Sequence, residues 1–366
     1  MTKHAPKSRD PRSKVAHIDA CLSDEVEYRR SAGFDRYDFV HQALPELALD
    51  QIDLSLSLLG KEVKAPLMVA PMTGGVDRGL DICRRLAAAA EKYGLPMALG
   101  SLRVAIEDPE RAKLFQVRDI APSILLFANV GAGQLRAGWG VEQCLKAVRL
   151  VDADHLLIHL NPIQEAVQGG DVDFTGMIER IRTVAAALAK EGISVGVREV
   201  GFGLSAEAAS KLVAAGIALL DCAGAGGTSW AKVEGMCADD DRARRLGETF
   251  GEWGIPTAES IRAVRGVSSE VHVIASGGLR SGLDVAKAVA LGADLAAMAR
   301  PLLVAADRGV EELNTFIETV LTELRVAMFG IGAANIDQLK TTPHLLDRGA
   351  LNGAVAATSK GKRHSR

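Results

Sequence analysis

Cysteine is scarce in this sequence, and its placement excludes two kinds of site. The 366 residues contain five cysteines, an odd number, and no two of them have CxxC spacing. A disulfide framework and a structural zinc site both depend on suitably spaced cysteines, so neither is expected. Scattered thiols of this kind fit a reducing compartment, and we expect a cytoplasmic protein.

Long apolar runs and an excess of charge are also absent. No apolar run approaches the roughly 20 residues of a membrane helix, and the N-terminal stretch MTKHAPKSRDPRSK lacks the apolar core of a signal peptide. The formal net charge of -3 gives no electrostatic reason to expect a nucleic-acid or membrane surface. We therefore expect neither nucleic acid nor a membrane as a partner.

The sequence does contain a regular alternation of short apolar runs with longer amphipathic stretches. The runs are continuously apolar, which predicts parallel strands covered on both faces. Segments between them, such as LDICRRLAAAAEKYG, have apolar residues at helical spacing and end near a glycine. Eight such units in roughly 250 residues predict an α/β fold, a (β/α)8 TIM barrel, with a doubly wound open sheet as the alternative. The predicted strands cover residues 67–71, 96–100, 124–129, 156–160, 194–199, 218–222, 271–276 and 294–299.

The barrel is expected to occupy residues 61–330. Residues 1–60 are expected to form an N-terminal extension, a basic arm followed by strand and helix segments that pack on the barrel. Residues 331–366 are expected to form a C-terminal helical segment and a basic tail. Both basic ends, residues 3–14 and 359–366, have few apolar residues and are predicted to be disordered unless a ligand orders them. The long interruption before the seventh run contains another short run, IPTAES, so the strand numbering there is open by one.

Polar residues gather at the carboxyl ends of the predicted strands, where TIM barrels place their active sites. The fourth run ends in IHLNPIQE, which places His159, Asn161, Gln164 and Glu165 within seven residues. Taken singly, such residues have structural explanations, since a lone histidine is usually hydrogen-bonded in a core and an asparagine can cap a helix. Their shared position on one rim predicts a functional site. The other polar and glycine positions on this rim are Met72, Thr73, Gly74, Ser101, Arg103, Asn129 and Arg198.

The last two strands predict an anion site. SGGLRSG places Gly277 and Gly278 between a strand and a helix, where glycine allows close backbone approach and free helix N–H groups attract an anion. The final strand ends in Ala299 and Arg300, which add a second wall and a cation. Phosphate sites in TIM barrels typically lie at these two loops. The glycine-dense stretch GAGGTSW, residues 224–230, is either a further binding loop or a flexible turn.

In these motifs the chain resembles the type 2 isopentenyl diphosphate isomerases. The shared motifs, in order, are MTGG, FANVGA, HLNPIQE, EVGFG, GAGGTSW and ASGGLRSGLDVAKA, and the similarity extends upstream through SKVAHI and DFVHQALPELALDQIDLS. HLNPIQE and FVHQALPELAL are the most specific, whereas ASGG matches many FMN-binding barrels. The resemblance implies interconversion of isopentenyl and dimethylallyl diphosphate with FMN, Mg²⁺ and NADPH as the reductant. It also implies a homo-oligomer, a tetramer or an octamer.

The resemblance also implies roles for the rim residues. Glu165 would coordinate Mg²⁺, which typically takes only one or two carboxylates beside phosphate and water. The implied catalytic residues are Gln164, Arg198 and His159. The implied flavin-binding residues are Met72, Thr73, Gly74, Ser101, Asn129, Arg198 and Thr228, with Gly277, Gly278, Ala299 and Arg300 at the flavin phosphate. The implied substrate-binding residues are Ser13, Lys14, Ser101, Leu102, Arg103, His159, Asn161 and Gln164.

Three positions depart from the family pattern. The usual Arg-Lys pair reads Ser13-Lys14, the usual GSQ ends in Leu102, and the lysine of VKEVG is Arg198. An arginine keeps its proton, whereas a buried lysine can exchange one. Arg198 therefore suits an electrostatic role beside the flavin, and it would lower activity if the family lysine relays protons.

Two other functions stay open on the sequence. An FMN-dependent oxidoreductase of the hydroxy-acid oxidase type would use the same barrel, although the His-Gly-Gly-Arg type of loop is absent where GAGGTSW stands. The three departures also allow a non-catalytic flavoprotein, or a family member altered for another prenyl diphosphate.

Overall fold

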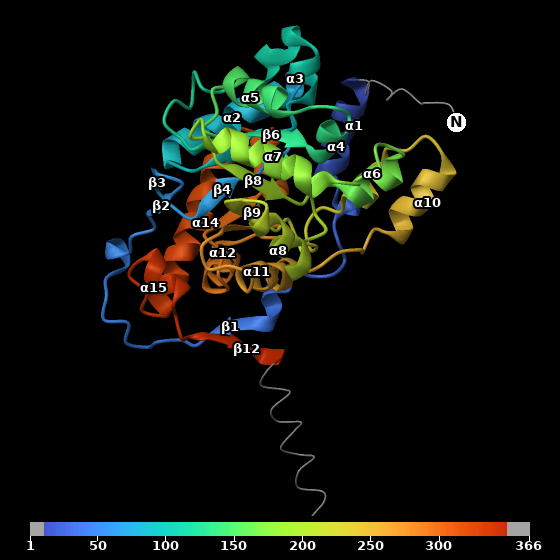
Figure 1. The fold of residues 1–366 in the computed structure, drawn as a ribbon. Helices are drawn as coiled ribbons and strands as arrows, with labels where there is room; N and C mark the ends of the chain where they lie inside the picture. Colours follow the sequence, from blue (N-terminus) through green and yellow to red (C-terminus); the bar gives the residue numbers. More distant parts are fainter. Residues whose placement is uncertain (1–10, 350–366) are drawn as a thin grey trace, which may run out of the picture.

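The computed structural model describes residues 11–349. Within this part of the chain, eight parallel strands close into a barrel in chain order, with the last strand paired to the first (Figure 1). The predicted TIM barrel and all eight predicted strands are confirmed. The IPTAES run adds no barrel strand, because Pro256 makes only an isolated bridge to Ala225 and a helix begins at Thr257. The barrel strands are β4 (Leu67–Val69), β5 (Met97–Ala98), β6 (Leu126–Gly131), β7 (His155–His159), β8 (Val195–Arg198), β9 (Leu219–Asp221), β10 (His272–Ser276) and β11 (Leu295–Met298).

Helices follow the strands and surround them (Figure 1). Local sequence signals set their ends: Gly94, at φ 63°, ends the helix after β4 in the left-handed conformation, and Ser281 and Asp284 form a capping box that starts the helix after β10. These helices are α2 (Asp77–Tyr93), α3 (Arg103–Glu107), η4 (Pro109–Phe115), α4 (Ala132–Arg136), α5 (Val141–Leu150), α6 (Pro162–Gln168), α7 (Met177–Ala189), α8 (Ala206–Ala214), α9 (Trp230–Met236), α10 (Asp241–Thr249), α11 (Thr257–Arg265), α12 (Gly282–Ala290), α13 (Arg300–Arg308) and α14 (Val310–Gly330).

The core has two layers, which explains why the strand sequences are continuously apolar. Side chains such as Met68 and Phe127 belong to the cluster inside the barrel, whereas their chain neighbours Val69 and Leu126 belong to the cluster between strands and helices. A hairpin, β2 (Leu56–Leu58) and β3 (Lys61–Val63), adds Leu58 and Val63 to the inner cluster. Both faces of each strand are therefore removed from water, as in other parallel sheets.

The segments before and after the barrel in the chain pair with each other outside it. Near the C-terminus, β12 (Leu345–Asp347) pairs antiparallel with β1 (Tyr37–Phe39) at the bottom of Figure 1, beyond α15 (Ile336–Lys340). The N-terminal segment contains three short helices, η1 (Asp24–Val26), η2 (Phe34–Arg36) and η3 (Leu49–Gln51). Among the described helices, none combines the length and apolarity that a bilayer crossing requires.

The first described helix corrects one expectation. Residues 11–14 were predicted to be disordered without a ligand, but they begin α1 (Pro11–Leu22), which packs against α9 and α13. Tertiary packing compensates for a sequence with little helical amphipathicity of its own. Residues 3–10 of the predicted basic arm and the predicted basic tail at 359–366 lie outside the described residues.

Candidate functional site

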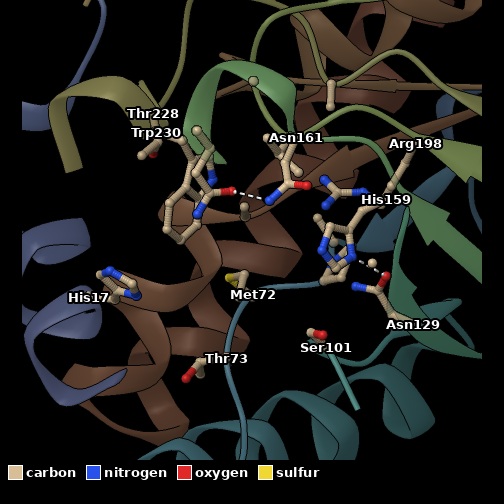
Figure 2. A pocket seen from close by; sticks show the side chains of 18 of the residues that line it. His17, Met72, Thr73, Ser101, Asn129, His159, Asn161, Arg198, Thr228 and Trp230 are labelled. Atoms are coloured by element: carbon tan, nitrogen blue, oxygen red, sulfur yellow. Dashed lines mark hydrogen bonds between the residues drawn. The ribbon is translucent and has the colours of Figure 1, made fainter. Parts of the chain in front are cut away.

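The predicted rim residues line one cavity at the carboxyl ends of the barrel strands (Figure 2). Its volume of about 1040 Å³ lies at the upper end of the usual range for small-molecule sites, so a cofactor and a substrate can share it. The predicted residues in its wall are Lys14, Met72, Thr73, Gly74, Ser101, Arg103, Asn129, His159, Asn161, Gln164, Glu165, Arg198, Thr228, Gly277, Gly278, Ala299 and Arg300.

One predicted substrate-binding residue, Leu102, is not among the residues that line the cavity. Leu102 is fully buried and packs in the cluster between the barrel and its helices, so its side chain faces the core. Burying this apolar side chain in the core is more favourable in free energy than exposing it in the wall of a polar cavity. Its backbone N–H donates to Asn129 O at 2.8 Å and fixes the loop after β5 against β6. Ser13 lies in α1, but its side chain is outside the described part of the structure.

His159 and Asn129 stand at the ends of two neighbouring strands and contact each other across the rim. His159 Nδ1 lies 3.0 Å from Asn129 Oδ1, and Figure 2 shows the pair at one wall of the cavity. Because an amide oxygen only accepts, this contact places a proton on Nδ1. Nε2 then accepts a hydrogen bond when the ring is neutral and donates one when it is protonated.

Three polar residues of the IHLNPIQE stretch form one hydrogen-bonded cluster. Asn161 precedes α6, whose first residue is Pro162, so positions three and four residues later face the same side. Asn161 Nδ2 donates to Gln164 Oε1 at 3.2 Å and to Glu165 Oε1 at 2.8 Å. Glu165 Oε2 also accepts from the backbone of Asp171 at 3.1 Å. The loop after α6 therefore holds the Glu165 carboxylate at the cavity wall.

Glycine at position 170 makes this arrangement of Glu165 possible. A Cβ atom on Gly170 would lie 1.8 Å from Glu165 Oε2, closer than any real contact of this kind. Any side chain here would displace either the loop or the carboxylate.

Sequence reasoning missed a buried carboxylate, Glu234 on α9, which anchors the same cluster. Gln164 Nε2 donates to Glu234 Oε1 at 2.7 Å, and His17 Nε2 lies 3.3 Å from Glu234 Oε2. The His17 ring also packs edge-on against Trp230, with 5.6 Å between ring centroids. Both ends of the Gln164 amide are thus fixed, one by Asn161 and the other by Glu234. The available signal was an acidic residue among the small and apolar residues of WAKVEGM, since buried carboxylates are rare unless paired.

Arg198 belongs to a buried ion pair formed across three adjacent strand ends. Its Nε donates to Asp221 Oδ2 at 3.0 Å, and Asp221 Oδ1 accepts from Ser276 Oγ at 2.5 Å and from the backbone of Ala223 at 3.2 Å. The Asp221 side chain is only 2% exposed and that of Arg198 is 10% exposed. Because Nε faces Asp221, the two Nη groups form the outer end of the side chain, and Figure 2 shows the guanidinium beside His159.

The residue after Arg198 shapes the adjoining wall. Glu199 is buried, and its Oε2 accepts from the backbone N–H groups of the next three residues, Val200, Gly201 and Phe202. Burial raises the pKa of Glu199 to about 7, and these three donors and Arg198 act in the opposite direction. The carboxyl group thereby sets the turn in which Val200 and Gly201 line the cavity.

The α1 helix brings a cation, Lys14, to the lining of the cavity. Lys14 Nζ donates to Gly74 O at 2.7 Å and lies 5.4 Å from the centre of the Phe115 ring. Arg103, at the start of α3, reaches Glu107 at 4.0 Å, and its side chain is 20% exposed. Together with His159, these residues add positive charge and hydrogen-bond donors to the lining of the cavity.

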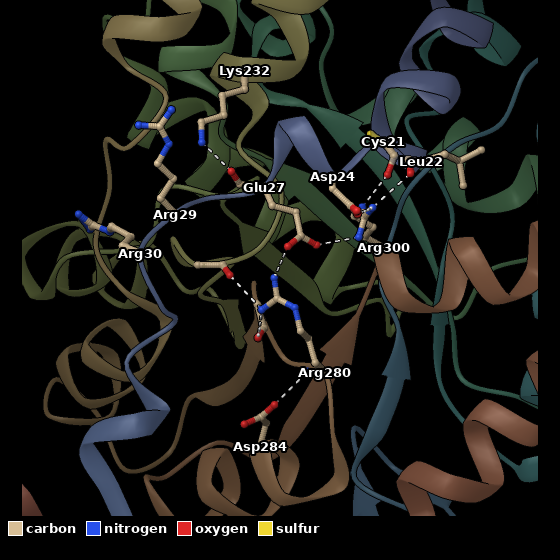
Figure 3. A network of polar contacts seen from close by, with 12 residues as sticks. Cys21, Leu22, Asp24, Glu27, Arg29, Arg30, Lys232, Arg280, Asp284 and Arg300 are labelled. Carbon is tan, nitrogen blue, oxygen red and sulfur yellow. Dashed lines mark hydrogen bonds and ion pairs between the residues drawn. The ribbon is translucent and has the colours of Figure 1, made fainter.

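The loops after β10 and β11 form the predicted phosphate end. Gly277 and Gly278 have φ values of 99° and 77°, and a Cβ on Gly277 would lie 2.1 Å from Gly224 O, so only glycine fits there. The α13 helix begins at Arg300, where the first N–H groups have no acceptor within the helix. The Arg300 guanidinium, however, is bound to Cys21 O, Leu22 O, Asp24 and Glu27 (Figure 3). The predicted cation is therefore already neutralised by the N-terminal segment.

No ready-made metal cluster accompanies Glu165. Within residues 11–349, no group of three or more histidine, cysteine, aspartate and glutamate side chains is arranged to hold a metal ion. A divalent cation at Glu165 would need further oxygen ligands from a bound anion and from water.

Comparison with known proteins places this cavity in a family. Residues 7–118 and 184–347 match the model of the FMN-dependent dehydrogenase family. In Synechococcus, an isopentenyl-diphosphate delta-isomerase is 50% identical over 89% of this chain and 93% of its own length. Proteins of the same name from Nostoc and from Methanothermobacter thermautotrophicus are 47% and 44% identical, over 89% and 91% of this chain and 93% and 92% of their own lengths.

Solved structures share the fold at low sequence identity. A mutant flavocytochrome b2 with bound pyruvate superimposes with a TM-score of 0.65 at 18% identity, over 93% of this chain and 83% of its own. A lactate oxidase from Pediococcus acidilactici does so with a TM-score of 0.61 at 17% identity, over 92% and 90%. The level of identity to the isomerases over nearly the whole chain decides the family: the chain belongs to the type 2 isopentenyl-diphosphate delta-isomerases, within the wider FMN-dependent dehydrogenase family.

Proposed function

We propose that the protein interconverts isopentenyl diphosphate and dimethylallyl diphosphate, with FMN reduced by NADPH and with Mg²⁺ on the diphosphate. The observation that carries this proposal is the Asn161, Gln164 and Glu165 cluster in the wall of a flavin-sized cavity. A single carboxylate beside several hydrogen-bond donors is what a metal-bound diphosphate requires.

The residues at one end of the cavity fit the flavin. Gly277 and Gly278 keep the backbone free of side chains beside the first N–H groups of α13, where a phosphate monoester would bind. Met72, Thr73, Ser101 and Asn129 would line the ring end. Thr228, and the backbone at Gly74, Ala299 and Arg300, would complete the site.

Arg198 would lie beside the flavin ring and contribute charge. Its Nε is engaged by Asp221, so its two Nη groups would donate to the ring edge and favour negative charge there. This role needs a fixed cation and no proton exchange, which an arginine satisfies.

The other wall would hold the substrate. Lys14, Arg103, His159 and Asn161 would contact the diphosphate oxygens, and Glu165 would share Mg²⁺ with them. Mg²⁺ would neutralise part of the diphosphate charge and fix its position.

The reaction adds a proton to the terminal alkene carbon of isopentenyl diphosphate and removes one from the methylene group that is attached to the other alkene carbon. When bound and reduced, FMN would supply an acid–base nitrogen and an electron-rich ring that favours positive charge on carbon. Gln164, held at both ends, would position the alkene, and Trp230 would keep water from it. When the His159 ring is protonated, its Nε2 would donate a hydrogen bond to a diphosphate oxygen.

Net use of reductant separates this proposal from a hydroxy-acid oxidase on the same barrel. The loop at 224–230 holds Thr228 and Ser229 and has no histidine to accept a proton from a hydroxy acid. We expect many turnovers of isopentenyl diphosphate for each NADPH consumed under anaerobic conditions. One NADPH or one electron acceptor consumed per turnover would contradict the isomerase and favour the oxidoreductase.

A further inference from the structure

The phosphate end of the cavity is bounded by a strap, residues 23–33, which lies between α1 and η2. Backbone hydrogen bonds fasten it to the cavity loops: Tyr28 N donates to Gly227 O and Ser229 N donates to Val26 O, each at 2.8 Å. Glu27 and Thr228 form an antiparallel bridge between these two contacts. Beyond them, Ala258 N donates to Ala32 O at 2.9 Å. The strap is therefore held along its length.

The strap lies directly on the glycines of the phosphate end. A Cβ on Gly226 would lie 2.4 Å from the backbone of Ala32, and one on Gly278 would lie 2.9 Å from the Ala32 Cβ. The strap backbone at Ala32 therefore packs directly against the backbone at Gly226 and Gly278, and no side chain would fit between them. The strap thus forms the end wall of the cavity.

Glu27 is the residue of the strap that faces the cavity, and two arginines hold it there. Arg280 Nη2 and Arg300 Nη1 each lie 2.7 Å from a different oxygen of the Glu27 carboxylate (Figure 3). Glu27, Arg280 and Arg300 all line the cavity. Asp24 also pairs with Arg300, but its side chain is 94% exposed, outside the end wall.

We propose that the strap, through Glu27, makes the cavity selective for a flavin mononucleotide and excludes the dinucleotide FAD. This inference rests on the proposed binding of FMN at Gly277 and Gly278. FAD extends from the same phosphate through a second phosphate to adenosine, so its extension would have to pass the end wall. There it meets a fixed carboxylate of like charge, and the two arginines that would attract the second phosphate are already paired with that carboxylate.

Flavin retention tests this without relying on turnover. The purified protein is incubated with equal excesses of FMN and FAD, freed of unbound flavin by gel filtration, and heated to release bound flavin for chromatography. Because the second phosphate of FAD and the Glu27 carboxylate carry like charges, we expect the wild type to retain FMN over FAD by at least about 100-fold. Glu27→Gln, which removes only the charge, should lower this ratio by about tenfold, and Glu27→Ala, which also opens space beside Arg280 and Arg300, should lower it further.

Asp24→Ala is the matched control, because it truncates the other acidic partner of Arg300 outside the wall, and its ratio should equal that of the wild type. Equal retention of both flavins by the wild type would overturn the inference whether or not any variant folds. So would a Glu27→Ala ratio equal to the wild-type ratio, or an equal fall in Asp24→Ala. A wild type that retains neither flavin would overturn the proposed cofactor as well, so the two failures are distinguishable.

Discussion

Arg198 Nε and Asp221 Oδ2 form an ion pair 3.0 Å long at the ends of β8 and β9, and both side chains are almost completely buried. The pair explains how this chain accommodates an arginine where its family resemblance predicts a lysine. Asp221 fixes the guanidinium, and Ser276 in turn fixes Asp221.

Replacing the arginine by lysine tests whether charge alone is required at this position. We expect Arg198→Lys to retain kcat to within about tenfold, since a cation remains opposite Asp221. A gain well above tenfold would show that proton exchange by lysine matters and that the arginine limits the wild-type enzyme.

Removing the cation should have a second, structural effect. Arg198→Met leaves Asp221 buried without its charged partner, which typically costs about 3–5 kcal/mol of unfolding free energy. Denaturant unfolding of this variant and of Arg198→Lys gives the difference, and a methionine variant as stable as the wild type would show that Ser276 and the Ala223 N–H satisfy Asp221 alone.

Glu165→Gln tests the metal assignment. The amide keeps the size of the side chain but is a poor Mg²⁺ ligand, so turnover should fall by at least about 100-fold while bound FMN stays unchanged. Asp173→Asn is the control, because Asp173 is a nearby carboxylate paired with Arg136, and it should keep wild-type turnover. Full activity of Glu165→Gln at limiting Mg²⁺ would place the metal elsewhere.

Glu234 should act by positioning Gln164. In Glu234→Gln the new amide can present its own N–H₂ to Gln164, which frees the Gln164 amide to turn. Misplacement at a reacting centre typically costs about 100-fold, so we expect kcat to fall by about 10- to 100-fold while KM and flavin content change little. Glu207→Gln, which alters an exposed carboxylate paired with Lys211 within α8, is the control. A change in KM alone, with kcat at the wild-type value, would contradict a positioning role.

The stability of the fold should depend on pH through Glu199. Its pKa rises from 4.5 to about 7 on folding, so the folded protein holds a proton that the unfolded chain has already lost in this range. Stability is then highest below pH 4.5 and falls by about 3 kcal/mol as the pH rises to 7, relative to a variant without this carboxyl group. The difference in unfolding free energy between wild type and Glu199→Gln, measured across this range, should follow that slope. A flat difference would show that the three backbone donors keep Glu199 ionised throughout.

The sequence predicted most of the barrel because each strand is buried on both faces and each run is therefore continuously apolar. It predicted the rim residues because strand ends in a TIM barrel all point to one side. Local patterns have less to say about contacts between distant segments. His17 and Glu234 are 217 residues apart, and Glu27 and Arg300 are 273 residues apart.

The same limit explains the wrong expectations. Residues 11–14 look disordered by composition, but α9 and α13 stabilise their helix. Leu102 was placed at the substrate by the family resemblance, whereas the turn after β5 points its apolar side chain into the core. Asp221, the partner of Arg198, lies at the end of a strand. From the sequence alone, an ion-pair role for its carboxylate could not be distinguished from a helix-capping role.

Proton exchange at carbon tests the central claim most directly. The purified protein, with FMN, NADPH and Mg²⁺ under anaerobic conditions in D₂O, is given isopentenyl diphosphate and followed by NMR. We predict dimethylallyl diphosphate with deuterium in the new methyl group, formed without matching loss of NADPH. A flavin that is bound and reduced, with isopentenyl diphosphate unchanged and free of deuterium, would contradict it.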